Sequence, residues 1–210
     1  EEQIARFAVN QYKYPSLDIR PYFKRNYLYG EAMTHILGYV GRINDRDVER
    51  LKKEEKFANY SGSTDMGKLG IERYYEEQLH GTTGFEEVEI NNRGKVVRKL
   101  REQSATAGKS IHLTIDFTLQ RYIMSLLSGQ KGAVVVLDPK DNSVLAMVST
   151  PSYDNNLFVD GISSSDYKRL LEDPTRPLYS RATQGVYPPA STVKPFVAVA
   201  ALTEGVITPN

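Results

Sequence analysis

Cysteine is absent from the 210 residues of the chain. Without it neither a disulfide framework nor a thiolate metal site can form. This suits an oxidising compartment but does not require one. The three histidines, His35, His80 and His112, lie too far apart for a local ligand pair, so we expect each to be structural. The residues imply neither a metal nor an organic cofactor.

Net charge is almost absent too, because 27 Lys and Arg face 26 Asp and Glu. Nucleic-acid-binding domains carry a marked basic excess, so we expect no nucleic-acid partner. The pair Lys24-Arg25 is interpreted as part of a solvated strand or turn. No apolar run reaches the roughly 18 residues that a membrane-spanning helix needs, and no signal peptide is found.

The stretch from Gly185 to Leu202 carries the pattern that a purely structural interpretation explains least well. Ser191 and Lys194 form S-x-x-K, followed by Pro195 and an apolar run that predicts a buried helix ending at Gly205. The i,i+3 spacing places the hydroxyl and the amine on one face, as a nucleophile and its base require. The helix N-terminus would stabilise an oxyanion, and burial would favour the neutral amine that can accept a proton.

The same spacing occurs twice more, at residues 128–131 in a Gly/Ser-rich turn and at residues 165–168 in a polar segment. Neither setting is rigid and poor in water, so we expect no chemistry at Ser128 or Ser165. For Ser191 the structural alternative is an N-cap serine followed by a lysine whose stem covers apolar surface. The uncharged run directly after Lys194 favours the catalytic interpretation.

Four strings carry a family resemblance: GVYPPASTVKP at 185–195, GAVVVLDP at 132–139, VLAMVSTPSYD at 144–154 and NLFVDG at 156–161. The first resembles the nucleophile motif of class B penicillin-binding proteins, the peptidoglycan D,D-transpeptidases, and in particular of their elongation type. The resemblance covers nearly the whole chain. It implies an α+β fold, with an N-terminal pedestal module at residues 1–105. Residues 106–210 would be the beginning of a penicillin-binding transpeptidase domain of the serine β-lactamase type, left incomplete.

The resemblance also implies an activity and partners. Ser191 would attack the D-Ala-D-Ala carbonyl of a peptidoglycan stem peptide, with Lys194 as the base for acylation. Stem peptides would be cross-linked during cell-wall elongation, and β-lactams would acylate the same serine. Residues 1–105 would contact membrane proteins of the elongation complex, a glycosyltransferase and a scaffold. The protein would lie on the periplasmic face of the bacterial inner membrane, held by one N-terminal anchor that this sequence lacks.

The segments S-x-N and K-[ST]-G, which complete such a site, are missing from the chain. We therefore expect a fragment that is inactive alone. Three residues depart from the family pattern: Ala190 stands where many members have glycine, and Leu28 and Asn155 stand where proline is common. Two other interpretations stay open, a serine β-lactamase or penicillin sensor, and a non-catalytic scaffold whose functional part is the first half.

Periodicity and turn residues predict the remaining elements. Helices are expected at 1–10, 31–39, 44–56, 67–79 and 165–171, with hairpins at 85–90 with 95–100 and at 133–137 with 143–149. A strand is expected at 111–115, and a helix from Asp116 or Thr118 that turns its apolar side chains inward. Those side chains are Leu119, Tyr122, Ile123, Leu126 and Leu127.

Overall fold

The computed structural model describes residues 2–14, 17, 24–92 and 96–208. Packing divides the chain into two compact units. The first joins Glu1–Leu113 to Ser152–Glu172, and the second joins Thr114–Pro151 to Asp173–Asn210. Residues 152–172 therefore pack within the first unit, although both their ends continue into the second. The boundary between residues 105 and 106 stays a prediction.

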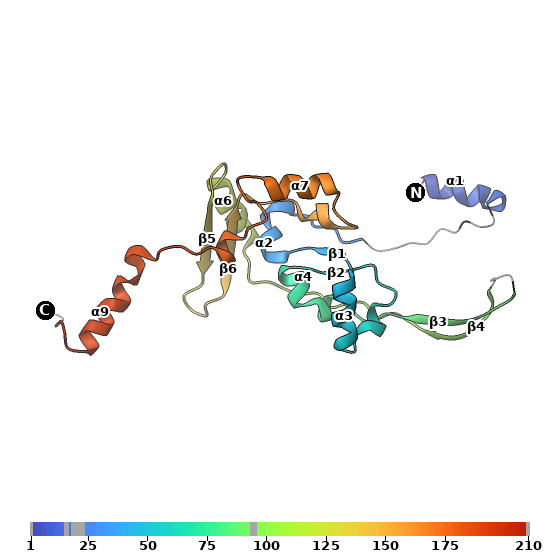
Figure 1. Cartoon of the computed structure of the whole chain (residues 1–210), viewed down its shortest axis with the longest axis horizontal. Helices are drawn as coiled ribbons and strands as arrows, with labels where there is room; N and C mark the ends of the chain where they lie inside the picture. The colour runs from blue at the N-terminus through green and yellow to red at the C-terminus, as the bar shows by residue number, and fades with distance from the viewer. Residues whose placement is uncertain (1, 15–16, 18–23, 93–95, 209–210) are drawn as a thin grey trace. The chain divides into compact units, whose positions relative to one another are not determined.

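The first unit mixes short helices with two antiparallel strand pairs (Figure 1). Its α-helices are α1 Glu2–Asn10, α2 Thr34–Leu37, α3 Asp45–Lys53, α4 Gly70–Tyr74, α5 Glu76–His80 and α7 Ser164–Glu172. Its 3₁₀ turns are η1 Gln11–Lys13, η2 Gly30–Ala32, η3 Phe57–Tyr60 and η4 Asn155–Phe158. Strand β1 Val40–Arg42 pairs with β2 Asp65–Gly67, and β3 Phe85–Ile90 pairs with β4 Val96–Gln103.

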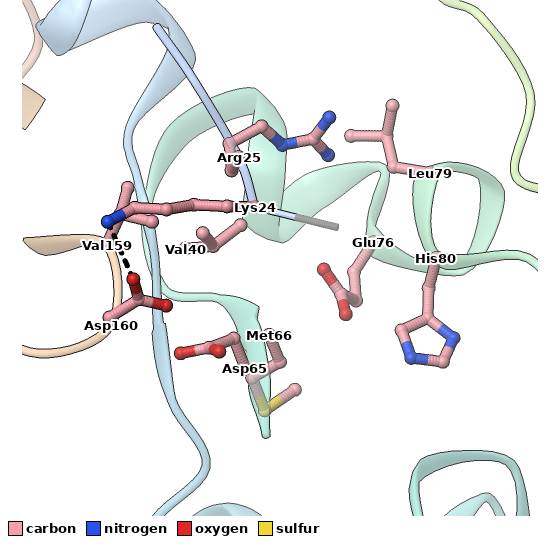
Figure 2. A pocket seen from close by; sticks show the side chains of 10 residues that line it. All are labelled: Lys24, Arg25, Val40, Asp65, Met66, Glu76, Leu79, His80, Val159 and Asp160. Carbon is pink, nitrogen blue, oxygen red and sulfur yellow. Dashed lines mark ion pairs between the residues drawn. The ribbon is translucent and has the colours of Figure 1, made fainter. Parts of the chain in front are cut away.

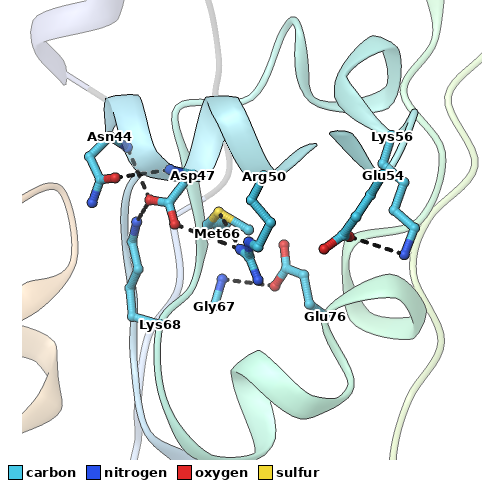
Figure 3. A network of polar contacts seen from close by, with 9 residues as sticks. All are labelled: Asn44, Asp47, Arg50, Glu54, Lys56, Met66, Gly67, Lys68 and Glu76. Carbon is cyan, nitrogen blue, oxygen red and sulfur yellow. Dashed lines mark hydrogen bonds and ion pairs between the residues drawn. The ribbon is translucent and has the colours of Figure 1, made fainter. Parts of the chain in front are cut away.

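Helix α3 shows how sequence sets local structure in this unit (Figure 3). Asn44 caps it: its side chain accepts from the Asp47 backbone N–H, and the Asp47 carboxylate accepts from the Asn44 N–H, a capping box. The apolar edge of the helix then places Leu51, 3% exposed, against Tyr60 and Met66. This cluster is the core beneath the β1–β2 pair.

The segment 152–172 is fastened to the first unit by side-chain amides and hydroxyls. The Asn156 amide both donates to the Tyr27 carbonyl and accepts from the Tyr27 N–H, each at 2.9 Å. Thr34 Oγ1 donates to the Tyr153 carbonyl at 2.6 Å, and Asn155 Nδ2 donates to the Gly38 carbonyl at 2.7 Å. These hydrogen bonds satisfy backbone groups of Tyr27, Gly38 and Tyr153, and they hold the segment 152–172 in place within the first unit.

In the second unit, helix α6 Phe117–Leu126 packs on the hairpin of β5 Gly132–Leu137 and β6 Val144–Thr150. Asp116 caps α6 by accepting from two backbone N–H groups. The core joins Ile123 to Ala146 and Val148. The chain then forms α8 Arg181–Gln184, the 3₁₀ turn η5 Ala190–Val193 and helix α9 Lys194–Thr203.

The mixed α and β fold and most predicted elements are confirmed. The corrections concern residues 111–115, the inward face of α6 and two helices of the first unit. Residues 111–115 form no strand: beside β6 they make a Thr114 hydroxyl bond to the Val144 carbonyl, and the first backbone bond follows at Asp116. Tyr122 and Leu126 are 61% and 59% exposed, so α6 turns a narrower face inward than predicted.

Two further predicted helices are shorter than expected. The helix at 67–79 is interrupted at Tyr75, which caps α4 and precedes α5. The helix at 31–39 is split into η2 and α2. Within the residues that the structure describes, no helix is long and apolar enough to cross a membrane.

Candidate active site

Ser191 lies in the 3₁₀ turn η5, and Lys194 is the first residue of α9. The Lys194 backbone N–H donates to the Ser191 carbonyl, which closes the turn between them. In a 3₁₀ turn the side chains at i and i+3 lie on the same side. The structure thus brings the two predicted residues together on one turn. No hydrogen bond joins their side chains in the described structure, and such bonds are often long without substrate.

The environment of this turn differs from the expectation. Ser191 and Lys194 are both exposed, and no residue of α9 is buried. Phe196 and Val197 are 77% and 62% exposed, although an all-apolar helix normally lies inside a protein. The expected burial of the amine is therefore not present in this chain, because nothing among the described residues covers α9.

The backbone just before Ser191 is left-handed. Ala190 has φ +49°, a conformation that costs a residue with a Cβ about 1–2 kcal/mol. It follows Pro189, whose carbonyl accepts from the Thr192 N–H at 3.2 Å and from the Thr192 hydroxyl. Glycine adopts this conformation without that cost. The structure thus gives a physical reason why residue 190 is a natural place for glycine.

The two other S-x-x-K spacings lie in different surroundings. Lys168 Nζ is 3.7 Å from the Glu172 carboxylate on the exposed side of α7. Lys131 Nζ donates to the Pro174 carbonyl at 3.2 Å and follows the end of α6 rather than leading a helix.

Sequence reasoning missed Arg181, which is 9% exposed in α8, ahead of the nucleophile turn. Ser180 and Ala182 on either side gave no indication that its guanidinium is internal.

A pocket of about 280 Å³ lies in the first unit, lined by Asp65, Glu76, His80 and residues around them (Figure 2). The Asp160 carboxylate is paired with Lys24 at 2.7 Å, and Glu76 accepts from the Gly67 N–H at 2.8 Å.

His80 is stacked on Tyr60 and bonded through Nε2 to the Ser63 hydroxyl at 2.8 Å. The side chains of Asp160, Glu76 and His80 therefore already have partners within the first unit. Across the described ranges no three His, Asp or Glu side chains come together as metal ligands.

Comparison with protein families matches both halves of the chain. Residues 1–113 match the penicillin-binding protein dimerisation domain, and residues 132–210 match the penicillin-binding protein transpeptidase domain. Ser191 and Lys194 both fall within the second match.

Curated relatives match over the full chain. Peptidoglycan D,D-transpeptidase MrdA of Haemophilus influenzae is 81% identical over 210 residues, which are 100% of this chain and 32% of the relative. The MrdA protein of Escherichia coli K12 is 63% identical over 210 residues, again the whole chain and 33% of the relative. The chain thus spans about a third of the length of these relatives.

Solved structures agree. The complex between PBP2 and MreC from Helicobacter pylori matches with a TM-score of 0.81 at 29% identity, covering 98% of this chain and 38% of that one. Pseudomonas aeruginosa PBP2 in complex with WCK 5153 matches with a TM-score of 0.72 at 45% identity, covering 92% of this chain and 37% of that one.

Proposed function

The chain belongs to the penicillin-binding proteins, and on this basis we propose that it is part of a peptidoglycan D,D-transpeptidase of the elongation type. One observation carries the proposal: Ser191 and Lys194 share a single turn at the start of an apolar helix, inside the residues that match the transpeptidase domain. The structural alternative, a capping serine and a lysine whose stem covers apolar surface, does not require an all-apolar helix directly after the lysine.

The proposed reaction is acyl transfer through a serine ester. Ser191 Oγ attacks the carbonyl carbon between the two terminal D-alanines of a stem peptide, and the Lys194 amine takes the hydroxyl proton. The C–N bond breaks as Lys194 gives that proton to the leaving nitrogen, and the terminal D-alanine departs with a free amino group. An amine of a neighbouring stem peptide then attacks the ester, forms the cross-link and releases Ser191. A β-lactam presents an equivalent strained carbonyl to the same oxygen.

The turn supplies part of this chemistry. The N–H of Ser191 itself can donate to the oxyanion, with a second donor coming from outside this chain. We propose that further residues of the longer protein also cover α9. Excluding water there would favour the neutral amine of Lys194 and strengthen each electrostatic contact with the oxyanion.

Intact-mass analysis after incubation with a penicillin tests the proposal on the longer protein that carries this chain. We expect one stable adduct on the wild type and none on Ser191→Ala. Lys194→Ala should form the adduct about 10²–10⁴-fold more slowly, the usual contribution of a general base. A stable adduct rather than rapid hydrolysis also separates a transpeptidase from a β-lactamase.

The chain provides its own matched controls. Ser128→Ala and Ser165→Ala remove the hydroxyls of the two other S-x-x-K spacings and should leave the adduct unchanged. A folded wild type that forms no adduct, or an adduct that survives Ser191→Ala, would contradict the mechanism.

We further propose that residues 1–105 bind a scaffold protein of the elongation complex at the periplasmic face of the inner membrane. The support is the match to PBP2 in its complex with MreC, which extends over 98% of the chain. Purified scaffold protein should bind the Ser191→Ala variant as tightly as the wild type, because the proposed surface does not include the nucleophile. Loss of binding in that variant would place the contact at the active site instead.

A further inference from the structure

Arg181 is a buried cation in the segment that leads to the nucleophile. It is 9% exposed, and in the described structure its guanidinium pairs with no carboxylate. Instead Nη1 donates to the carbonyls of Arg176 at 3.3 Å and Tyr179 at 3.4 Å, and Nη2 donates to the carbonyl of Thr175. One side chain thus gathers three backbone carbonyls of the loop before α8.

The backbone of the same residue is attached to the hairpin. The Arg181 N–H donates to Ser149 Oγ at 2.8 Å, and Ser149 lies in β6 with 4% of its surface exposed. Arg181 therefore joins the loop 175–179 to the edge of the folded core. Only arginine offers several donors in a rigid planar fork, so neither lysine nor a neutral side chain reproduces this arrangement.

Burying a charge without a carboxylate is unfavourable unless its donors are satisfied. The sequence nevertheless keeps arginine here rather than a neutral side chain. Three carbonyl partners on one short loop show what the charge achieves, which is to fix the path of the chain. The Tyr179 hydroxyl closes the other side of the loop by donating to the Gln184 carbonyl at 2.6 Å.

Helix α8 and residues 185–190 lead from this loop to Ser191. A Cβ at Gly185 would overlap the carbonyl oxygen of Arg181 and the ring of Tyr187, so these three residues are in close contact. Pro188 and Pro189 follow, and each proline ring restricts its own φ. Two of the nine residues between Arg181 and Ser191 are thus restricted at φ.

We propose that Arg181 is a positioning residue for the acyl-transfer reaction, acting through the segment 175–190 to hold Ser191 in its reactive place. The inference rests on the proposed transpeptidase function. Arg181 does not touch the reacting atoms, and its removal lets the approach to η5 take several paths. A small displacement of a nucleophile costs up to about 10²-fold in rate.

The test uses the longer protein and measures penicillin binding and the acylation rate constant separately by stopped-flow. Arg181→Met should slow acylation about 10- to 100-fold, with the noncovalent dissociation constant changed less than about twofold. Arg181→Lys should recover only part of the rate. Added guanidinium ion should partly restore the rate of Arg181→Ala.

The control variant is Gln120→Ala in the same unit. Gln120 is 1% exposed and bonds the backbone N–H and carbonyl of Met147 in β6, away from the nucleophile segment. It should lower the melting temperature as much as Arg181→Met without slowing acylation of the folded protein. Tyr179→Phe serves if Arg181→Met does not fold, and should slow acylation several-fold by opening the same loop.

The outcomes separate the two proposals. Wild-type rates in the folded Arg181 and Tyr179 variants, or equal slowing by Gln120→Ala, overturn the positioning role alone. A wild type that forms no Ser191-dependent adduct overturns the transpeptidase proposal and this inference with it.

Discussion

Two segments of the chain, one in each unit, differ sharply in how the rest of their unit holds them. In residues 152–172 the side chains of Tyr153 and Asn155 are 4% and 0% exposed. In residues 187–203, which carry the proposed nucleophile, no side chain is buried. The first segment is held by side-chain packing and by hydrogen bonds from side-chain amides. The second is held by its own backbone. Substitutions in the first should therefore change stability, and those in the second should change reactivity.

Burial also sets the protonation of two tyrosines in the first unit. Burial, with the Glu72 carboxylate nearby, raises the pKa of Tyr27, and burial raises the pKa of Tyr153. Both phenols therefore stay neutral at ordinary pH and act as packing groups. Tyr27 Oη accepts from the Val40 N–H at 2.8 Å, which ties the start of β1 to the place where Asn156 binds.

The largest loss of stability is expected for Asn156→Ala. It leaves the N–H of buried Tyr27 without a partner, at about 1–3 kcal/mol for an unsatisfied group, and leaves the Tyr27 carbonyl with only the longer bond from the Gly30 N–H at 3.4 Å. We expect the free energy of unfolding to fall by about 3 kcal/mol, measured by urea titration. The control Asn10→Ala removes the hydrogen bond that the exposed Asn10 side-chain amide donates to the Arg6 carbonyl, and it should cost under about 0.5 kcal/mol. Equal losses would contradict the view that residues 152–172 are held by these amides.

A pair of valines tests packing alone. Val148 in β6 is 2% exposed and Val197 in α9 is 62% exposed. In this chain, Val148→Ala should cost about 2 kcal/mol by thermal unfolding and Val197→Ala under about 0.5. If the longer protein covers α9, as proposed, Val197→Ala should approach the cost of Val148→Ala there. If Val197→Ala still costs little stability in that protein, the proposal that further residues cover α9 is wrong.

Sequence reasoning succeeded where one short pattern determines structure. The capping residues Asn44 and Asp116, the β5–β6 hairpin and the shared turn of Ser191 and Lys194 all follow from local spacing. It failed where long-range contacts decide. Residues 111–115 have strand propensity but form no ladder with β6: the Thr114 hydroxyl donates to the Val144 carbonyl, and the backbone bond to Leu145 comes from Asp116.

The buried amides and the guanidinium illustrate the same limit. Asn156 and Arg181 look like surface residues in the sequence, and only the fold supplies the carbonyls that they bind. The left-handed backbone at Ala190 was equally invisible as a dihedral angle. The family resemblance still marked that position, because glycine is the residue that the angle favours.

Ala190→Gly should stabilise the nucleophile turn, because it removes the Cβ that a left-handed backbone disfavours. The expected gain is about 1 kcal/mol by thermal unfolding of the second unit. Ala198→Gly is the matched control, since Ala198 is exposed inside α9 and glycine there should instead cost about 1 kcal/mol. Opposite signs for the same substitution at two positions eight residues apart would show that the left-handed backbone at residue 190 is strained.

The smallest effect is a pH dependence of α3. Burial tends to raise the pKa of Asp47, but the hydrogen bonds from Lys68 and Asn44 outweigh it and lower that pKa (Figure 3). A carboxylate with a lowered pKa in the folded state contributes stability above its unfolded pKa of about 3.9, and loses it as pH falls through the folded value.

Asp47→Asn keeps an oxygen for the cap and removes the charge. Its cost should be about 0.5–1 kcal/mol at pH 7 and should shrink toward zero below pH ~3, measured as the difference in melting temperature from the wild type. Asp45→Asn, in the same first turn but without a lysine partner among the described residues, should cost less at pH 7. A cost for Asp47→Asn that does not change with pH would show that the cap geometry, and not the ion pair with Lys68, stabilises this helix.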